Sequence, residues 1–405
     1  MTNTKVVMMG LGYIGLPTAA FIASKNCSVL GVDISTDIVE TINNGKIHIV
    51  EPDLAGLVKI MVDRGNLKAS NKPDFADIFI IAVPTPFKNN YEPDITFVES
   101  AVKMLKPFLK EGDLLIIEST SPVGTTEKIA KLIYAKRPDL KDKIYIAYCP
   151  ERVLPGNVIY ELENNDRVIG GLNEESTIKA LNFYRHFVKS KLHKTNARTA
   201  ELCKLVENSY RDVNIAFANE LSMICEKANI NVWELIKLAN KHPRVKILNP
   251  GTGVGGHCIA IDPWFIVSDY PSEAKLIKAS REINNYKTQW VIEKIKNIAL
   301  KFELDQKYKP VIGCLGLAFK PNIDDLRESP ALKIYNQLNK EKFNVIASEP
   351  NISNHKEVEL HNYEDTIEKS DIIIFLVAHK QFYNLNISDK KICLDFCGVR
   401  NSVNC

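Results

Sequence analysis

Short apolar runs alternate with segments of helical periodicity at the start of the chain. Residues 5–9 and 28–32 are strand-length apolar runs, and residues 16–24 between them have the spacing of a helix. Later runs of the same kind cover 77–83, 114–118 and 143–148. Strands that are apolar along their whole length and alternate with helices are typical of a parallel sheet covered on both faces. This pattern predicts a doubly wound α/β domain.

The middle of the chain has a different periodicity. Residues 200–228 contain no Pro or Gly and carry apolar side chains at helical spacing, and residues 231–240 and 273–301 continue the pattern. Long helices with apolar faces and no third layer to cover them usually pack against a partner subunit. We therefore expect a helical connector that also forms a dimer surface, which predicts a homodimer.

The last hundred residues repeat the order of elements seen at the start. The segments 310–320, 344–349 and 370–377 parallel the first strand and turn, the second strand, and the strand at 77–83. This second copy lacks a GxGxxG turn and has Lys320 at the corresponding place. It predicts a second Rossmann-like sheet whose ligand is a different anionic nucleotide.

The length of the chain sets the number of domains. A chain of 405 residues exceeds one ordinary core, so two or three domains are expected. The patterns place them at 1–198, 199–302 and 303–405. The predicted fold class is α/β, with two Rossmann-like doubly wound parallel-sheet domains joined by a helical central domain.

Composition excludes several classes of protein. The net charge of +3 is too small to indicate nucleic-acid binding. Nine cysteines, an odd number without CxxC pairs, argue for reduced thiols in a cytoplasmic protein and against a metal site. The first residues do not have the pattern of a signal peptide, and the longest apolar runs are strand-sized, so no membrane association is expected.

A dinucleotide fingerprint lies between the first strand and the first helix. Gly10 makes the turn, Gly12 lets a pyrophosphate approach the main chain, and Gly15 lets the helix pack closely on the strand. Asp33 ends the second strand, where it would accept hydrogen bonds from a ribose diol. No arginine in 34–37 could pair with a 2′-phosphate, which favours NAD over NADP. The predicted cofactor loop comprises Gly10, Gly12, Tyr13, Ile14 and Gly15. The alternative is a tight turn beside a satisfied surface aspartate.

Polar residues follow three of the other predicted strands. Thr85, Thr120 and Glu151 come shortly after the strands at 77–83, 114–118 and 143–148. In a doubly wound sheet ligands bind at this carboxyl edge. These residues are therefore site candidates, although each of them alone is also explained by ordinary turn and cap chemistry.

A glycine-rich loop at 251–258 ends in a cysteine. Four glycines precede Cys258, and Asp262 follows four residues later. Glycines let the main chain adopt positive φ and approach a ligand, so this loop is a candidate binding loop. The alternative is a connector that ends in a buried cysteine. On the long predicted helix, Lys204 and Asn208 are four residues apart and share one face. The alternative is that this face is simply exposed to solvent.

These parts together indicate oxidation of a substrate carried on a nucleotide. Oxidation of an alcohol to an aldehyde needs no thiol, but a thiol is useful when the aldehyde is oxidised further. It adds to the carbonyl, the thiohemiacetal gives up hydride, and water cleaves the resulting thioester. Cys258 is the candidate nucleophile for this sequence of steps.

Six motifs occur in one order along nearly the whole chain. They are Gly10-Leu-Gly-Tyr-Ile-Gly-Leu-Pro17, Ser119-Thr-Ser-Pro-Val-Gly-Thr125, Cys149-Pro-Glu-Arg152, Lys204-Leu-Val-Glu-Asn208, the segment 255–262, and the segment 319–330. Together they resemble the UDP-glucose/GDP-mannose dehydrogenase family. The segments 51–54, 150–156 and 257–265 look most like the members that oxidise UDP-N-acetyl-D-mannosamine. The members that act on UDP-glucose usually carry a second glutamate where this chain has Pro155.

The resemblance implies a set of catalytic roles. Cys258 is the nucleophile. Lys204 stabilises the oxyanion that develops at the substrate, and Asn208 donates a further hydrogen bond to it. Asp262 assists as a general base through a water molecule and pairs electrostatically with Lys204. Glu151 assists thioester hydrolysis. The residue implied to hold the attacking water is Thr120.

The resemblance also implies the binding residues. Thr85, Thr120 and Arg327 contact NAD. Lys320 lies near the sugar or its phosphates, and Arg244 reaches the sugar nucleotide of a neighbouring subunit. The whole set of predicted substrate-binding residues is Glu151, Arg152, Lys204, Asn208, Arg244, Gly255 and Lys320.

The resemblance implies an NAD-dependent UDP-sugar 6-dehydrogenase of polysaccharide biosynthesis. In this interpretation the three domains bind NAD, form the dimer and catalytic region, and bind the UDP-sugar. The expected reaction is four-electron oxidation of UDP-N-acetyl-D-mannosamine. The alternatives are UDP-N-acetylglucosamine or UDP-glucose by the same mechanism, or a protein of another class that binds NAD and a nucleotide without catalysis.

Overall fold

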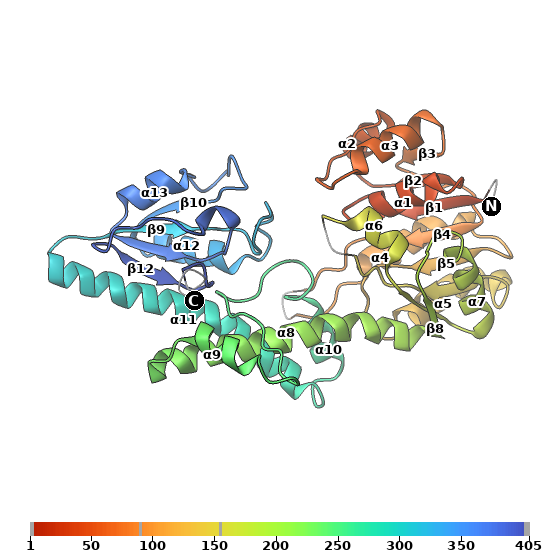
Figure 1. The fold of residues 1–405 in the computed structure, drawn as a ribbon. Coiled ribbons are helices and arrows are strands. Elements are labelled where there is room, and N and C mark those ends of the chain that lie inside the picture. Colours follow the sequence, from red (N-terminus) through yellow and green to blue (C-terminus); the bar gives the residue numbers. More distant parts are fainter. Residues whose placement is uncertain (1–3, 89–90, 154–155, 401–405) are drawn as a thin grey trace. The chain divides into compact units, whose positions relative to one another are not determined.

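The computed structural model describes residues 4–88, 91–153 and 156–400 (Figure 1). The chain divides into two compact units after Glu207. The helix α8 (Ala197–Ala228) is continuous through this division. The predicted boundaries at 198 and 302 stay predictions. Pro155, which bears on the choice of sugar, lies outside the described residues.

The first unit is built on an eight-stranded sheet with the order β3-β2-β1-β4-β5-β6-β7-β8. The strands from β3 to β6 are parallel, β7 pairs antiparallel with β6, and β8 is parallel to β7. The strands are β1 (Lys5–Met9), β2 (Ser28–Val32), β3 (Leu67–Ser70), β4 (Ile78–Ile81), β5 (Leu114–Ile117), β6 (Tyr145–Tyr148), β7 (Arg167–Gly171) and β8 (Leu192–Asn196). All five strands predicted in this region are therefore present.

Helices cover both faces of this sheet, as the apolar strands predict. Val6 and Met8 of β1 belong to one buried cluster with side chains of α1, α3, α6 and α7, whereas Val7 and Met9 belong to a second cluster with side chains of α4 and α5. Alternate residues of a strand point to opposite faces, so both sets must be apolar. The helices are α1 (Gly15–Ser24), α2 (Thr36–Asn43), α3 (Leu54–Asp63), α4 (Thr96–Leu105), α5 (Thr125–Tyr134), α6 (Val158–Asn164) and α7 (Glu174–Tyr184), with short 3-10 turns η1 (Lys106–Phe108) and η2 (Pro138–Leu140).

The second unit contains a four-stranded parallel sheet with the order β10-β9-β11-β12. Its strands are β9 (Val311–Leu315), β10 (Asn344–Ser348), β11 (Ile372–Phe375) and β12 (Ile392–Asp395). Its helices besides α8 are α9 (Val232–Ala239), α10 (Asp262–Asp269), α11 (Lys275–Gln306), α12 (Pro330–Lys340) and α13 (Tyr363–Lys369), with the 3-10 turn η3 (Lys380–Phe382). The repeat predicted from the sequence is confirmed, and β12 is an addition to it.

The start of α12 shows why a helix begins there. The side chain of Ser329 accepts a hydrogen bond from the main-chain N–H of Leu332, and Pro330 occupies the first turn, where its missing N–H costs nothing. Side chains of α11 and α12 then form the core with β9 and β11. None of the described helices combines the length and apolarity that crossing a bilayer requires.

A buried polar network joins α8 to α11 within the second unit. A guanidinium nitrogen of Arg281 lies 2.6 Å from Oδ1 of Asp212, and Asn284 donates to the same oxygen at 2.8 Å. Asn219 donates to Asn284 at 2.9 Å and accepts the main-chain N–H of Gly251 at 2.8 Å. Charged groups at this depth need a partner, because burial removes their hydration. The network therefore holds the two helices in register and fixes the start of the glycine-rich loop.

Removing one partner of the Asp212–Arg281 pair is expected to destabilise the second unit strongly. Both residues are buried, so Asp212→Ala leaves an uncompensated guanidinium and lowers the free energy of unfolding by about 3–5 kcal/mol. Urea denaturation measures this change. The matched control is Glu282→Ala on the exposed side of α11, which is expected to change stability by less than about 0.5 kcal/mol. Equal effects of the two variants would contradict the role of the network.

Candidate active site

The GxGxxG turn has the geometry that a dinucleotide requires. Gly10 has a φ of 91°, and a Cβ there would lie 2.6 Å from the carbonyl oxygen of Ala82. A Cβ on Gly15 would collide with the carbonyl of Gly10, whereas a Cβ on Gly12 would meet nothing within 4 Å. The protein thus fills the space around two glycines and leaves it open over Gly12, which fits a pyrophosphate near the main chain at the start of α1.

Asp33 braces this turn and keeps capacity for a ligand. Its Oδ2 accepts the main-chain N–H of Leu11 and its Oδ1 accepts that of Ser35, both at 3.0 Å. Each carboxylate oxygen has a second lone pair, so a ribose diol can still donate to the half-buried side chain. Tyr13 is 47% exposed, and Ile14 is the residue before the first turn of α1. These residues fit NAD.

His48 is a neighbour of this turn that sequence reasoning missed. Burial lowers the pKa of His48, while the carboxylate of Asp33 and the main chain of Leu11 act on it in the opposite direction. His48 follows α2 in a loop without a motif, so the sequence carries no signal for its position. The folding of that loop brings it to Asp33.

Thr85 and Thr120 follow β4 and β5, which are paired in parallel. Thr85 is 7% exposed, and the hydroxyl of Ser119 donates to the carbonyl of Val83 at 2.8 Å, so the two loops are linked. The loop after Thr120 is also held from α8. The buried carboxylate of Glu201, which sequence analysis did not single out, accepts the main-chain N–H groups of Gly124 at 2.6 Å and Thr126 at 2.7 Å.

The carboxylate of Glu151 is buried and fixed from two sides. Its Oε2 lies 3.0 Å from a guanidinium nitrogen of Arg167, and its Oε1 accepts the main-chain N–H of Arg152 at 2.7 Å. The main-chain carbonyl of Glu151 accepts a hydrogen bond from Nζ of Lys204 at 2.7 Å. The structure therefore brings Glu151, Arg152 and Lys204 together in the first unit. The predicted pairing of Lys204 with Asp262 stays a prediction.

Arg167 serves two buried carboxylates. Besides Glu151 it lies 3.8 Å from Oε1 of Glu118, which also accepts the hydroxyl of Tyr184 at 2.6 Å. The other oxygen of Glu118 is buried and has no hydrogen-bond partner. Burial raises the pKa of Glu118 to about 7, and the attraction of Arg167 opposes this only in part. Near neutral pH the carboxyl group of Glu118 therefore gains or loses a proton.

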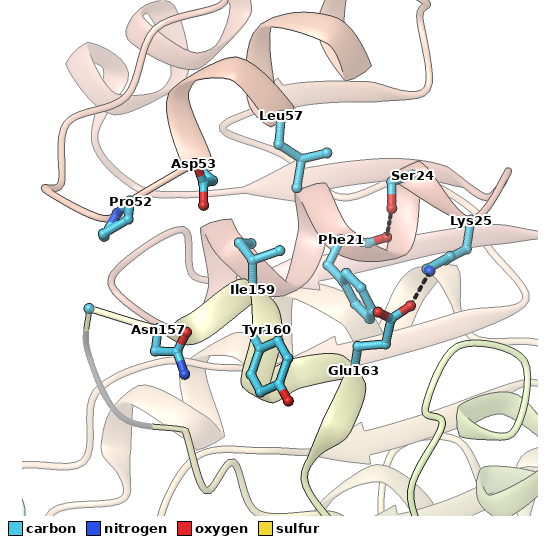
Figure 2. Close-up of a pocket in the computed structure, with 11 residues that line it drawn as sticks. Phe21, Ser24, Lys25, Pro52, Asp53, Leu57, Asn157, Ile159, Tyr160 and Glu163 are labelled. Carbon is cyan, nitrogen blue, oxygen red and sulfur yellow. Dashed lines mark hydrogen bonds and ion pairs between the residues drawn. The ribbon is translucent and has the colours of Figure 1, made fainter.

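The motif at 51–54 acts on the loop that follows Glu151. The buried carboxylate of Glu51 accepts the main-chain N–H groups of Gly156 at 2.9 Å and Val158 at 2.8 Å. Beside it lies a hollow of about 290 Å³ between α1, α3 and α6, where Lys25 and Glu163 pair at 2.7 Å (Figure 2). The lining residues are Phe21, Ser24, Lys25, Pro52, Asp53, Leu57, Gly156, Asn157, Ile159, Tyr160 and Glu163. None of them is a predicted site residue.

The candidate nucleophile lies in the second unit at the entrance to α10. Cys258 is exposed, and its main-chain carbonyl accepts the N–H groups of Ile261 at 3.0 Å and Asp262 at 2.8 Å. Asp262 is 3% exposed, and its Oδ2 lies 2.5 Å from the carboxamide nitrogen of Asn208 on α8. The structure thus brings together three predicted catalytic residues, Cys258, Asp262 and Asn208.

The glycines before Cys258 are required by protein packing. A Cβ on Gly255 would lie 2.7 to 2.8 Å from Glu328, Phe319 and Pro330, and a Cβ on Gly256 would lie 2.7 Å from the ring of Phe319. Gly256 also donates its main-chain N–H to the carbonyl of Arg327 at 3.0 Å. The close approach that the sequence suggested is therefore made by the segment 319–330. A main-chain contact between Gly255 and the substrate stays a prediction.

The predicted cations of the second unit lie on exposed segments. Lys320 is exposed in the turn after β9, and Arg327 holds the carboxylate of Asp325 with distances of 2.6 to 3.0 Å. Arg244 is exposed in the segment after α9. Their contacts with NAD or the sugar nucleotide stay predictions.

Three parts of one protein family match this chain. The NAD binding domain of the UDP-glucose/GDP-mannose dehydrogenase family matches residues 4–188, the central domain matches 198–286, and the UDP binding domain matches 313–401. The chain therefore belongs to this family. It is an NAD-dependent UDP-sugar dehydrogenase with the predicted arrangement of two sheets and a helical middle.

Relatives of known name cover nearly the whole chain. A UDP-N-acetyl-D-mannosamine dehydrogenase from Campylobacter jejuni is 53% identical, over 97% of this chain and 99% of the relative. An NDP-N-acetyl-D-galactosaminuronic acid dehydrogenase from Ralstonia nicotianae is 50% identical, over 97% and 96%. The solved structure of a UDP-D-ManNAc dehydrogenase from Pyrococcus horikoshii is similar, with a TM-score of 0.88 at 37% identity, over 98% of this chain and 96% of that one.

The raised pKa of Glu118 predicts a pH dependence of stability. Between about pH 4.5 and 7 the folded state keeps a proton that the unfolded state has released, so this contribution is present at low pH and lost as the pH rises through 7. Glu118→Gln is expected to reduce the loss of stability between pH 5 and 8 by about 2–3 kcal/mol, measured by urea denaturation across that range.

The control is Glu175→Gln on the exposed start of α7, which is expected to keep the pH dependence of the unchanged protein. If Glu118→Gln showed the same pH dependence as the unchanged protein, Glu118 would be ionised in the folded state throughout that range.

Proposed function

We propose that this member of the family oxidises the C6 hydroxyl of UDP-N-acetyl-D-mannosamine to the carboxylate of UDP-N-acetyl-D-mannosaminuronate. The observation that carries the chemistry is the exposed Cys258 at the entrance to α10, with the hydrogen-bonded pair of Asn208 and Asp262 next to it. The choice of sugar is supported by the relatives that bear this name, at 51% to 53% identity.

The overall reaction consumes one alcohol, one water and two NAD⁺, and it gives one carboxylate, two NADH and three protons. Gly12 and Asp33 would hold NAD⁺, which would supply the electron acceptor for both oxidations. The first oxidation needs a group that takes the hydroxyl proton, and Asp262 fills this role through a water molecule. The second oxidation begins when the thiolate of Cys258 bonds to the aldehyde carbon and gives a thiohemiacetal.

An oxyanion develops on the sugar oxygen when the thiolate adds. Lys204 supplies a cation and Asn208 supplies a carboxamide N–H to this oxygen. Their existing contacts support these roles, because Lys204 donates to a neutral carbonyl and Asn208 is held by Asp262. Neither contact neutralises the cation, which stays available for the oxyanion.

The thioester is then cleaved by water. Glu151 accepts the proton of the attacking water while Thr120 holds that water, and the thiolate of Cys258 leaves as the uronate forms. The guanidinium of Arg167 and the main-chain N–H of Arg152 keep the carboxylate of Glu151 in one orientation. The buried partner Glu118 adjusts how much of the charge of Arg167 is available to Glu151.

A sugar of the galacto series is the second candidate substrate, because a relative named for N-acetyl-galactosaminuronic acid is 50% identical. UDP-N-acetylglucosamine and UDP-glucose are further alternatives. The product, a uronate still activated by UDP, suits the assembly of an acidic polysaccharide. We infer that this takes place in the cytoplasm, since none of the described cysteines is in a disulfide.

We also infer that the chain forms a homodimer through α8. Tyr210, Phe217 and Ile224 are 68%, 54% and 57% exposed and repeat every seven residues, so they lie on one side of the helix. An exposed apolar stripe of this kind usually contacts another protein. A second copy would cover it with the same stripe about a twofold axis.

The activity is tested by following NADH with each UDP-sugar in turn. We expect two NADH per UDP-N-acetyl-D-mannosamine, and slower turnover of the gluco and galacto sugars. Cys258→Ser is expected to lower the rate of uronate formation by roughly 10³-fold or more, because the hydroxyl is a far weaker nucleophile. The control is Cys225→Ser, which changes a buried cysteine on α8, away from the loop of Cys258. A normal rate of uronate release by Cys258→Ser would exclude the covalent route.

The dimer is tested by placing a charge on the stripe. Phe217→Asp is expected to halve the mass measured by analytical ultracentrifugation at micromolar concentration, because a carboxylate would have to be buried in the interface. Arg211→Asp introduces the same side chain at an exposed position on another side of α8 and is expected to leave the mass unchanged. A Phe217→Asp protein with the mass of a dimer would place the interface elsewhere.

A further inference from the structure

Glu349, the acid at the end of the second strand of the second sheet, points into the protein interior. Glu349 follows β10, and its Oε2 accepts the main-chain N–H groups of Leu317 at 2.8 Å and Ala318 at 2.9 Å. Asp33 makes the corresponding contact with Leu11 in the first sheet. However, the side chain of Glu349 is fully buried, whereas Asp33 is half-buried. A ribose diol therefore has no access to Glu349, which serves the protein itself.

A buried histidine extends this contact to the other end of the turn. His379 follows β11, and its Nε2 lies 3.0 Å from Oε2 of Glu349. Its Nδ1 lies 3.0 Å from the main-chain nitrogen of Asn322. A main-chain N–H can only donate, so Nδ1 carries a lone pair and the proton of the neutral ring sits on Nε2, where it is donated to Glu349. The pair thus ties residues 317, 318 and 322 to one point.

Further bonds keep this pair in place. Oε1 of Glu349 accepts the main-chain and side-chain N–H groups of Asn351, both at 3.1 Å. Burial alone would raise the pKa of Glu349, but the hydrogen bond from His379 and those from the main chain hold its pKa below the ordinary value. Protonation of Nδ1 would set a donor against Asn322 and against the side-chain nitrogen of Asn351, 2.8 Å away. The contacts of both ring nitrogens therefore hold the imidazole in one orientation.

The turn that this pair holds carries two residues of interest, Lys320 and Phe319. Lys320 is exposed at its tip. Phe319, the preceding residue, packs against Gly255 and Gly256, which are three and two residues before Cys258. A single segment thus carries the cation assigned to the nucleotide and supports the loop that presents the thiol.

We propose that Glu349 and His379 are positioning residues that hold Lys320 for the phosphates of the nucleotide and Phe319 against the loop of Cys258. Binding of the nucleotide and the reactivity of the thiol are thereby coupled within the second unit. This rests on the proposed roles of Lys320 and Cys258. The pair itself does not touch the substrate.

The first experiment measures binding of UDP, the probe that carries the phosphates without the sugar. His379→Leu removes both ring hydrogen bonds and is expected to raise the Kd for UDP by about tenfold or more, since a loosened turn must be ordered on binding. The Kd for NAD⁺, whose site lies in the first unit, is expected to change by less than about twofold. His379→Gln keeps one donor and one acceptor, so its Kd for UDP is expected to lie between those of the unchanged protein and of His379→Leu.

The second experiment measures the rate at which iodoacetamide alkylates Cys258, followed by mass spectrometry. In the unchanged protein, saturating UDP is expected to slow alkylation several-fold. In His379→Leu, at a UDP concentration that saturates the variant, this effect is expected to disappear. Phe319→Ala keeps the buried pair and is expected to bind UDP within about threefold of the unchanged protein, yet to lose the effect of UDP on Cys258.

The outcomes separate this inference from the proposed function and from a stabilising role. The control is His186→Leu, an exposed histidine of the first unit, which is expected to change neither quantity. If the unchanged protein does not bind UDP, the proposed function fails. If it binds UDP and His379→Leu binds it equally well, the inference is wrong. Equal weakening of UDP and NAD⁺ binding would show that the pair only stabilises the fold. Should His379→Leu not fold, His379→Gln and Phe319→Ala decide the same questions.

Discussion

The packing of two bare glycines against Phe319 is the constraint on which the second unit depends. Gly255 and Gly256 present no side chain, so the ring of Phe319 and the segment up to Pro330 lie directly on the main chain that leads to Cys258. The main-chain bond from Gly256 to Arg327 closes the same contact. Any side chain larger than hydrogen would push these two segments apart. The position of the thiol is therefore set by the loop after β9 as much as by its own loop.

The two sheets show how one fold supports two uses of the same acid. In both, the carboxylate at the end of the second strand accepts main-chain N–H groups from the turn after the first strand. Asp33 is short, half-buried and free to take further donors, whereas Glu349 is longer, fully buried and occupied by His379 and Asn351. The first acid can serve a ribose. The second can serve only the turn, which carries the exposed Lys320, the residue that we propose for the phosphates of the nucleotide.

Buried charge is arranged differently in the two units. In the first unit a single guanidinium, Arg167, lies against two carboxylates, and burial raises the pKa of Glu118 although the attraction of Arg167 opposes this rise. In the second unit Arg281 faces Asp212, and amide side chains complete the network. The first arrangement suits a group whose charge must respond during a reaction, and the second suits a rigid support.

The sequence by itself determined the strand and helix order, the repeat of the sheets, the dinucleotide turn and the candidate thiol, because each is a local pattern of a few consecutive residues. It also suggested Lys204, Asn208, Glu151 and Asp262 through matched motifs. It carried no signal for His48, Glu201 or Arg167, or for the pairing of Glu349 with His379, because the partners in these contacts are separated by up to 77 residues. Tertiary structure alone decided that glycines near Cys258 pack against Phe319, because that contact depends on how distant segments meet. It also decided which acids are buried and which stay open to a ligand.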